Sequence, residues 1–236
     1  MSPRRVPVSR RDRPAKALLS REGLVATALR IMHDEGLERV TMRRLASELD
    51  TGPASLYVYV RNTAELHGAL LDELLLGLEL PAEAVAAGRP KGSVERWREG
   101  LVELLCGYTA LLLGHPSLAR SVLTLRPSGP NYLRLIEALL GLLRAGGVPE
   151  RQAAWGVDLL LQHATATAAE QGTRDESVDA DGEIHTQAMA IREATGDEYP
   201  NIGLVRDELF SGTGEQRLRW MFAALIEGVA TTATPA

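Results

Sequence analysis

The chain has 236 residues, 45% of them hydrophobic and 24% charged, which is the composition of an ordinary soluble globular protein. This length suffices for one large domain, or a small and a medium one, with a substantial core. The single cysteine, Cys106, excludes both an internal disulfide and a zinc site built from cysteines, and it fits a reducing compartment.

The sequence shows no targeting or membrane segment. The basic N-terminus is not followed by the apolar stretch of roughly 7 to 15 residues that a signal peptide requires. No uninterrupted apolar run approaches the roughly 20 residues of a membrane span. We therefore expect a cytoplasmic protein with no membrane partner.

The net charge of −5 conceals an uneven distribution of charge along the chain. Residues 1–66 hold 12 lysines and arginines against 8 acidic residues, whereas the remainder holds 14 against 23. A basic front end on an acidic body predicts that a polyanion meets only the first quarter of the chain. For the first sixteen residues alone, a solvated charged tail is an equally good interpretation.

Two helices are predicted after the N-terminal arm. Ser20 is the expected N-cap of the first, which Gly36 ends, and Thr41 is the expected N-cap of a short second one. Asp50 then marks a tight turn that leads to Pro53. The next stretch, SLYVYV, has the composition of a strand, but both flanks read as helical and a strand would have no partner. We therefore predict a third short helix here.

The remaining segments also have helical patterns. Residues 63–80 are predicted to form one leucine-rich connector helix, and residues 81–92 form a Pro/Gly-rich linker. Further helices are expected over 93–113, after Pro116, over 130–143 and 149–170, and from Thr213, where T-x-x-Q matches a capping box. Residues 172–183 are acidic and turn-rich and are predicted to form a loop.

The predicted fold class is all-α. We expect a flexible basic arm at residues 1–19 and a three-helix helix-turn-helix DNA-binding domain at residues 20–66. A larger helical domain for ligand binding and dimerisation is expected at residues 67–236.

The string VTMRRLASELDTGPASLYVYVRNTAELHGALLDELL, residues 40–75, resembles the helix-turn-helix and fourth helix of the TetR family of transcriptional regulators. A weaker similarity to the tetracycline-repressor branch covers Trp97, GHP at 114–116, RPSGPNY at 126–132, the AGGV before Pro149 and the final helix. Two positions depart from the family pattern: Asp50 stands where the turn usually has Gly, and Thr63 where a phosphate-binding Lys is common. The resemblance implies a dimeric DNA-binding protein with a ligand cavity.

The resemblance implies a set of residues that contact double-stranded operator DNA. Arg43 is the main candidate for a base contact, because a guanidinium can bond guanine O6 and N7 together; the alternative is an ordinary surface arginine. Pro53 and Ala54 offer only shape and thymine-methyl contacts, whereas the hydroxyls in the set suit phosphate oxygens. For Tyr57, a half-buried core position is equally plausible. The full predicted set is Thr41, Arg43, Arg44, Pro53, Ala54, Ser55, Tyr57, Tyr59 and Thr63, with Arg4, Arg5, Arg10, Arg11 and Arg13 of the arm on the backbone or in the minor groove.

The same resemblance implies a cavity for a small-molecule effector. Its expected lining is Leu104, Tyr108, Val122, Leu125, Leu135, Ala138, Trp155, Gln162 and His163, and plain core is the alternative for each apolar member. Val122 falls where the tetracycline repressor has its metal-binding histidine, and valine cannot ligate magnesium. We therefore expect no metal or cofactor, and a hydrophobic or aromatic effector.

A homodimer is expected from the last two long helices, which would form a four-helix bundle with their copies. The predicted interface residues are Trp155, Leu159, Ala166, Leu218, Phe222, Leu225 and Val229. A two-fold dimer implies a palindromic operator whose recognition helices are about 34 Å apart.

The predicted function is that of a repressor that leaves its operator when the effector binds. A ligand-responsive activator is an alternative that the sequence does not separate from it. An all-α small-molecule-binding protein or an enzyme is a further alternative, although no nucleophile motif, Gly-rich phosphate loop or His-x-x-x-His pair is present. His163 and Glu170 could supply two metal ligands, but a structural histidine is the commoner case.

Overall fold

The computed structural model describes residues 19–81, 96–176, 180–194 and 196–235, and all regular secondary structure within them is helical. The predicted all-α fold is thereby confirmed. Contacts divide the chain into two units, Met1–Asn62 and Thr63–Ala236. Nearly all of the predicted basic arm and linker lies outside the described residues.

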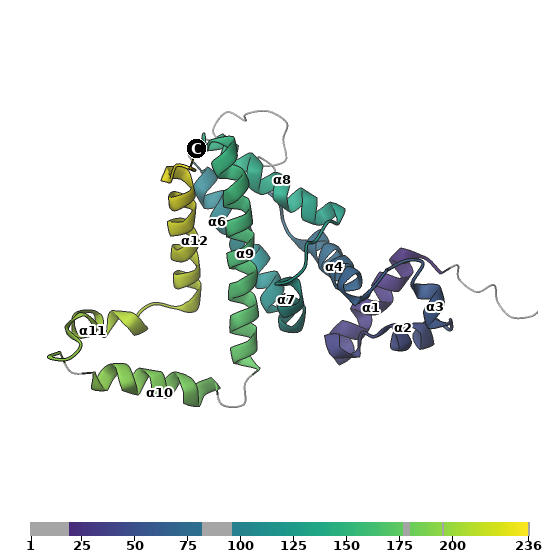
Figure 1. Cartoon of the computed structure of the whole chain (residues 1–236), viewed down its shortest axis with the longest axis horizontal. Helices are drawn as coiled ribbons and strands as arrows, with labels where there is room; N and C mark the ends of the chain where they lie inside the picture. Colours follow the sequence, from purple (N-terminus) through teal and green to yellow (C-terminus); the bar gives the residue numbers. More distant parts are fainter. Residues whose placement is uncertain (1–18, 82–95, 177–179, 195, 236) are drawn as a thin grey trace, which may run out of the picture. The chain divides into compact units, whose positions relative to one another are not determined.

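The first unit contains α1 (Arg21–Glu35), α2 (Met42–Glu48) and α3 (Pro53–Leu56), shown in Figure 1. Both predicted N-caps are confirmed: the Ser20 hydroxyl accepts a hydrogen bond from the Gly23 amide, and the Thr41 hydroxyl accepts one from the Arg44 amide. The core of this unit is apolar and almost fully enclosed. Its most deeply buried side chains are those of Leu24, Ala28, Ile31, Leu45, Leu56 and Val60.

The turn between α2 and α3 depends on Asp50. Its φ of 48° makes it the one residue other than glycine with a left-handed backbone among the described residues. Asp tolerates this conformation better than most residues. The chain then enters α3 through Pro53, whose fixed φ suits the first helical position.

The stretch SLYVYV forms no strand, as predicted, but only its first two residues are helical: α3 ends at Leu56, and residues 57–59 form a turn where a longer helix was predicted. After the single turn of α3, the amides of Tyr59 and Val60 both donate to the Leu56 carbonyl, at 2.9 and 3.2 Å. The side chains of Leu56 and Val60 are buried, and they anchor the segment to the core. Tertiary packing therefore outweighs local β propensity here.

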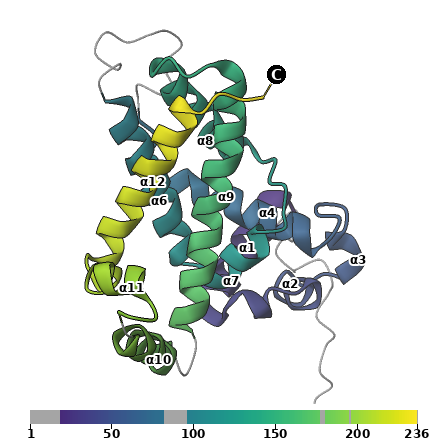
Figure 2. The same cartoon turned by 60° about the vertical axis from the view of Figure 1, so that its left-hand side comes forward.

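The second unit is a bundle built around α9 (Glu150–Asp175), which packs against α6 (Trp97–Leu113), α7 (Pro116–Val122), α8 (Pro130–Ala145) and α12 (Gly214–Thr231). In Figures 1 and 2, α9 and α12 run side by side along the bundle. The predicted capping box at the start of α12 is confirmed, with both the Thr213 and the Gln216 hydrogen bonds present.

Two predicted segments differ in the structure. The connector helix was predicted over residues 63–80, but α4 covers only Thr63–Leu74 and is followed by a 3-10 turn at Leu75–Gly77. The predicted length was wrong because an apolar run alone does not fix where a helix ends. The loop predicted over residues 172–183 is also wrong at both ends. The helix α9 continues to Asp175 and α10 (Ala180–Glu193) begins five residues later. Gly172 does not end the helix. It allows Pro116 to approach α9 closely, since a Cβ at this position would lie 2.4 Å from Pro116 Cβ.

The elements α10, α11 (Pro200–Val205) and a 3-10 turn at Glu208–Phe210 extend beyond the bundle (Figures 1 and 2). None of their described side chains is buried, and Leu204 is 83% exposed. In the described residues no single helix has the length and apolarity to cross a membrane; α6 and α7 meet that test only as a pair bent by 113°.

Candidate functional site

The first unit presents an exposed face made by the start of α2 and by α3 with its following turn. Pro53, Ala54 and Ser55 are exposed, and Tyr57 and Val58 are 51% and 81% exposed. This favours the surface interpretation of Tyr57 over the core one. The prominent Val58 was not among the predicted contacts, although its place opposite the buried Leu56 and Val60 could have indicated it.

Arg43 and Arg44 are neighbours in α2 but have different surroundings. Arg43 is exposed and takes part in none of the ion pairs formed by the described residues. Arg44 donates to Glu35 Oε1 at 2.8 Å and also pairs with Glu48, and these hydrogen bonds raise the pKa of its guanidinium. The charge of Arg44 thus links α2 to the end of α1, whereas the guanidinium of Arg43 is exposed; the DNA contacts of both residues stay predictions.

The Tyr59 hydroxyl is also used within the protein. It donates to the Leu19 carbonyl oxygen at 2.6 Å, and the side chain is partly buried. This bond ties the turn after α3 to Leu19, which precedes the N-cap of α1, and the phosphate contact of Tyr59 stays a prediction. Thr41 and Thr63, by contrast, are exposed at the N-terminal ends of α2 and α4.

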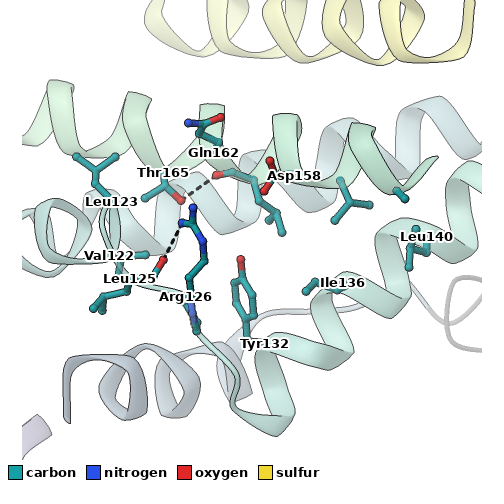
Figure 3. Close-up of a pocket in the computed structure, with 14 residues that line it drawn as sticks. Val122, Leu123, Leu125, Arg126, Tyr132, Ile136, Leu140, Asp158, Gln162 and Thr165 are labelled. Carbon is teal, nitrogen blue, oxygen red and sulfur yellow. Dashed lines mark hydrogen bonds between the residues drawn. The ribbon is translucent and has the colours of Figure 1, made fainter. Parts of the chain in front are cut away.

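The second unit contains a cavity of about 480 Å³, a size that suits a small organic molecule. Figure 3 shows it between α8, α9 and the segment that follows α7. The helix α8 contributes Tyr132, Ile136 and Leu140, which are four residues apart and so lie on one face. The residues that complete the lining are Val122, Leu123, Leu125, Arg126, Pro127, Ala154, Val157, Asp158, Leu161, Gln162 and Thr165.

The cavity wall is largely apolar with a few polar groups. Arg126 is exposed, and its guanidinium donates only a long hydrogen bond, 3.3 Å, to the adjacent Leu125 carbonyl (Figure 3). Burial, and secondarily the Asp158 carboxylate, raises the pKa of Tyr132, so its phenol stays protonated and can donate. Thr165 donates to the Leu161 carbonyl at 2.8 Å. A ligand in this cavity would therefore meet a cation, a phenol and a carboxylate on an otherwise apolar surface.

Three of the nine predicted cavity residues line this cavity: Val122, Leu125 and Gln162. Leu104, Leu135 and Ala138 are buried core residues on other helix faces. Tyr108 is also buried, with its hydroxyl 3.1 Å from Thr165 Oγ1, so it lies behind the cavity wall.

The other two predicted residues lie elsewhere. His163 faces α12, with Nε2 2.7 Å from Met221 Sδ and its ring edge-on to Phe222, and Trp155 is 51% exposed. The missed residues follow a spacing that the sequence contains, at 132, 136 and 140 in α8 and at 154, 158, 161 and 165 in α9. The described residues include no cluster of three or more His, Cys, Asp or Glu that could hold a metal ion.

The predicted dimer residues fall into two groups. Trp155 and Leu159 are 51% and 44% exposed, and Ala166, Leu218 and Leu225 are partly exposed. Phe222 and Val229 are 0% and 9% exposed because they face the protein's own core, so their assignment to the interface is wrong. Trp220, which was not among the predicted residues, is 73% exposed on α12.

A polar pair lies behind the cavity wall. His67 on α4 has its Nδ1 2.6 Å from Ser121 Oγ on α7, next to the cavity residue Val122. His67 Nε2 is buried and has no hydrogen-bond partner among the described residues, and burial lowers the pKa of this side chain.

A three-helix unit with a helix-turn-helix, followed by a helical unit with a ligand-sized cavity, is the architecture of transcriptional regulators of the helix-turn-helix class. Comparison with known proteins gives the family. Residues 24–70 match the family described as bacterial regulatory proteins, tetR family, and residues 89–232 match the domain described as tetracyclin repressor-like, C-terminal domain.

Individual relatives agree with these matches. A structure of the transcription regulator SCO7704 from Streptomyces coelicolor is 50% identical, covers 94% of this chain and 99% of that one, and has a TM-score of 0.74. The structure of ActR of Streptomyces coelicolor in complex with actinorhodin is 33% identical. The match covers 90% of this chain and 96% of ActR, with a TM-score of 0.76. The transcriptional repressor DrrR1 of Streptomyces coeruleorubidus is 30% identical over 69% of this chain. The chain spans a little over half the length of the first two curated relatives, 57% and 52%.

The chain belongs to the TetR family of bacterial transcriptional regulators. The resemblance found in residues 40–75, and that of the C-terminal part to the tetracycline-repressor branch, are both confirmed. The family and the relatives named above are regulators rather than enzymes.

His67 predicts a pH dependence of stability. Because its pKa is lower in the folded protein than the ordinary value of 6.5, the folded state binds this proton less well than the unfolded state. The stability that neutral His67 contributes is fully present above its pKa in the unfolded state. It is lost as pH falls through its pKa in the folded state. His67→Gln should therefore reduce the drop in melting temperature between about pH 8 and about pH 5. The exposed His33→Gln is the control, and an equal drop in the wild type and the His67 variant would contradict the prediction.

Proposed function

We propose that the protein is a homodimeric repressor that binds a palindromic operator through α2 and α3 and leaves it when a hydrophobic aromatic effector enters the cavity. The observation that carries this proposal is the presence, in one chain, of an exposed helix-turn-helix face and a ligand-sized apolar cavity. The name of DrrR1, a repressor, favours repression over activation. The protein would act in the cytoplasm and needs no catalytic activity.

Few side chains on the exposed face can read base sequence through hydrogen bonds. Arg43 is its one candidate for bidentate reading of guanine, whereas Pro53, Ala54 and Val58 offer apolar surface to thymine methyl groups. Thr41, Ser55, Tyr57 and Thr63 carry hydroxyls that suit phosphate oxygens. We infer that specificity depends on one arginine and on shape, and that the hydroxyls set the position of the helix.

The polar groups of the cavity indicate an effector with an acidic substituent on an aromatic body. The Arg126 guanidinium has no acidic partner among the described residues, so it can pair with a carboxylate or phenolate. Tyr132 and Gln162 can add hydrogen bonds, and the apolar wall made by Ile136, Leu140 and the α9 residues suits flat rings. The relative ActR binds actinorhodin and (S)-DNPA.

An exposed apolar stripe on α9 and α12 supports the dimer. Trp155, Leu159 and Trp220 lie on neighbouring helices and are each more than 40% exposed. Tryptophan is enriched at the energetic centres of interfaces. Paired with its copy, this stripe would complete a four-helix bundle and set two recognition helices about one DNA turn apart.

Arg43→Ala should weaken binding to a palindrome from the protein's own upstream region by about tenfold or more, because one bidentate base contact is lost. A DNA-shift titration at fixed salt measures this. Arg144→Ala, which removes the same charge from the exposed end of α8, should leave binding unchanged. A wild type that retards no DNA at low salt, or retards all sequences equally, would overturn the proposed function.

Arg126→Gln should weaken binding of 2-naphthoic acid by about tenfold, since a charge-assisted hydrogen bond is lost. Binding of the neutral 2-naphthamide should change by less than about threefold, because the apolar wall is intact. Fluorescence titration of both probes gives the two ratios. Equal losses for acid and amide would show that Arg126 does not recognise the charge.

Trp220→Glu and Leu159→Glu should each weaken the dimer by at least about tenfold, because a carboxylate would be buried in an apolar interface. Light scattering after size exclusion across a dilution series measures the association. Leu133→Glu, at a 55% exposed position of α8, is the matched control. If the control dissociates as readily as the two variants, the interface lies elsewhere.

A further inference from the structure

The lining of the cavity contains two charged residues of opposite sign, Arg126 and Asp158. Arg126 lies in the segment between α7 and α8, whereas Asp158 lies on α9. Their side chains form no ion pair with each other or with any other described residue. The acidic effector proposed above uses only the guanidinium of Arg126, which leaves the carboxylate of Asp158 without a role.

The Asp158 side chain belongs to the cavity face of α9. At about 100° per residue, it lies within about 40° of Ala154 and Thr165, which also line the cavity. Trp155 and Leu159 of the exposed stripe lie about 60° and about 100° farther round the helix. The carboxylate is exposed and accepts no hydrogen bond from the described residues, so it is available to a ligand.

The phenol of Tyr132 lies within range of both charges. Burial raises its pKa, the Asp158 carboxylate adds to this rise, and the Arg126 guanidinium opposes it. In Figure 3, Tyr132 comes from α8 and Asp158 from α9, and Arg126 enters from the segment before α8. A cation and an anion therefore stand on different walls of one cavity, with a protonated phenol within range of both.

The two charges decide which ligands suit the cavity. An acid without a second charge is attracted by Arg126 but repelled by Asp158, and this repulsion is screened less beside an apolar wall than in water. An ionised carboxylate can only accept hydrogen bonds, so the matching ligand group is a donor, and a protonated amine is a strong one. A ligand with both an ammonium and a carboxylate group would satisfy both residues.

We propose that Asp158 forms a cation-binding subsite of the cavity, and that the effector carries a protonated amine as well as an acidic group on its apolar body. This proposal rests on the proposed function, because it takes the cavity to be the effector site. Arg126 would bind the acidic group and Asp158 the ammonium group, with Ile136 and Leu140 against the rings. A cationic side chain of a second copy is the other source of a partner for Asp158, and the experiment separates the two.

The test uses three probes that share a naphthalene ring system and differ in charge. 2-Naphthoic acid is an anion, 2-naphthylmethylamine is a cation, and 6-(aminomethyl)-2-naphthoic acid carries both charges. Asp158→Asn removes the negative charge at nearly constant volume. Glu137→Gln removes the same charge at an exposed position of α8 outside the lining, and it is the matched control. Fluorescence titration of the full chain without DNA gives the dissociation constants.

Asp158→Asn should weaken binding of the amine and of the doubly charged probe by at least about fivefold, because a charge-assisted hydrogen bond is lost at a partly hydrated position. Binding of 2-naphthoic acid should stay the same or become tighter, because a like charge is removed. Retained binding of the acid also shows that the variant is folded. Glu137→Gln should change each of the three dissociation constants by less than about twofold.

Amine binding by Asp158→Asn within twofold of the wild type would overturn the subsite. Equal losses for acid and amine would also overturn it, because Asp158 would then only shape the cavity. If Asp158→Asn weakens the dimer in light scattering but leaves amine binding unchanged, the carboxylate pairs with a second copy instead.

The wild-type protein separates failure of the subsite from failure of the proposed function. Binding of the acid without binding of the amine would overturn the subsite and leave the proposed function standing. Binding of none of the three probes would overturn the subsite together with the aromatic effector. A wild type that binds the probes as expected but retards no operator DNA would overturn the proposed function alone.

Discussion

The second unit depends on how closely other helices approach α9. A Cβ on Gly156 would lie 2.5 Å from the Val229 side chain, and one on Gly172 would lie 2.4 Å from Pro116. These two glycines let α12 and α7 pack directly on the α9 backbone. Sixteen residues separate the two glycines, so at about 100° per residue these contacts lie on roughly opposite sides of α9. Asp158 and Gln162, which lie between them along the helix, face the cavity.

Short-range physics accounts for most of what the sequence predicted correctly. The caps at Ser20, Thr41 and Thr213 each involve groups three residues apart, so their hydrogen bonds can be inferred without knowing the fold. SLYVYV required one further step, because its composition favours a strand. Burial of Leu56 and Val60 at a spacing of four decided the matter, and this spacing could be read from the sequence once the neighbouring helices were predicted.

The cavity and the interface were harder because their helices are apolar on more than one side. In α8, Leu135 and Ala138 face the core, whereas Tyr132, Ile136 and Leu140 face the cavity. Both sets have helical spacing, and family resemblance transferred the wrong one. In α12 the buried Phe222 and the exposed Trp220 are likewise both large and aromatic. Hydrophobicity predicts that such residues are buried somewhere, but not against which neighbour.

Polar residues are misjudged for a related reason: the sequence does not show their partners. No local pattern indicates that Arg44 pairs with both Glu35 and Glu48. The hydrogen bond between His67 and Ser121 and the one from the Asn131 amide to Asp72 join residues 54 and 59 positions apart, so no local pattern reveals them. Apolar contacts tolerate small displacements, whereas directional bonds weaken steeply with angle. These bonds therefore fix where α7 and α8 lie on α4 more closely than apolar packing alone would.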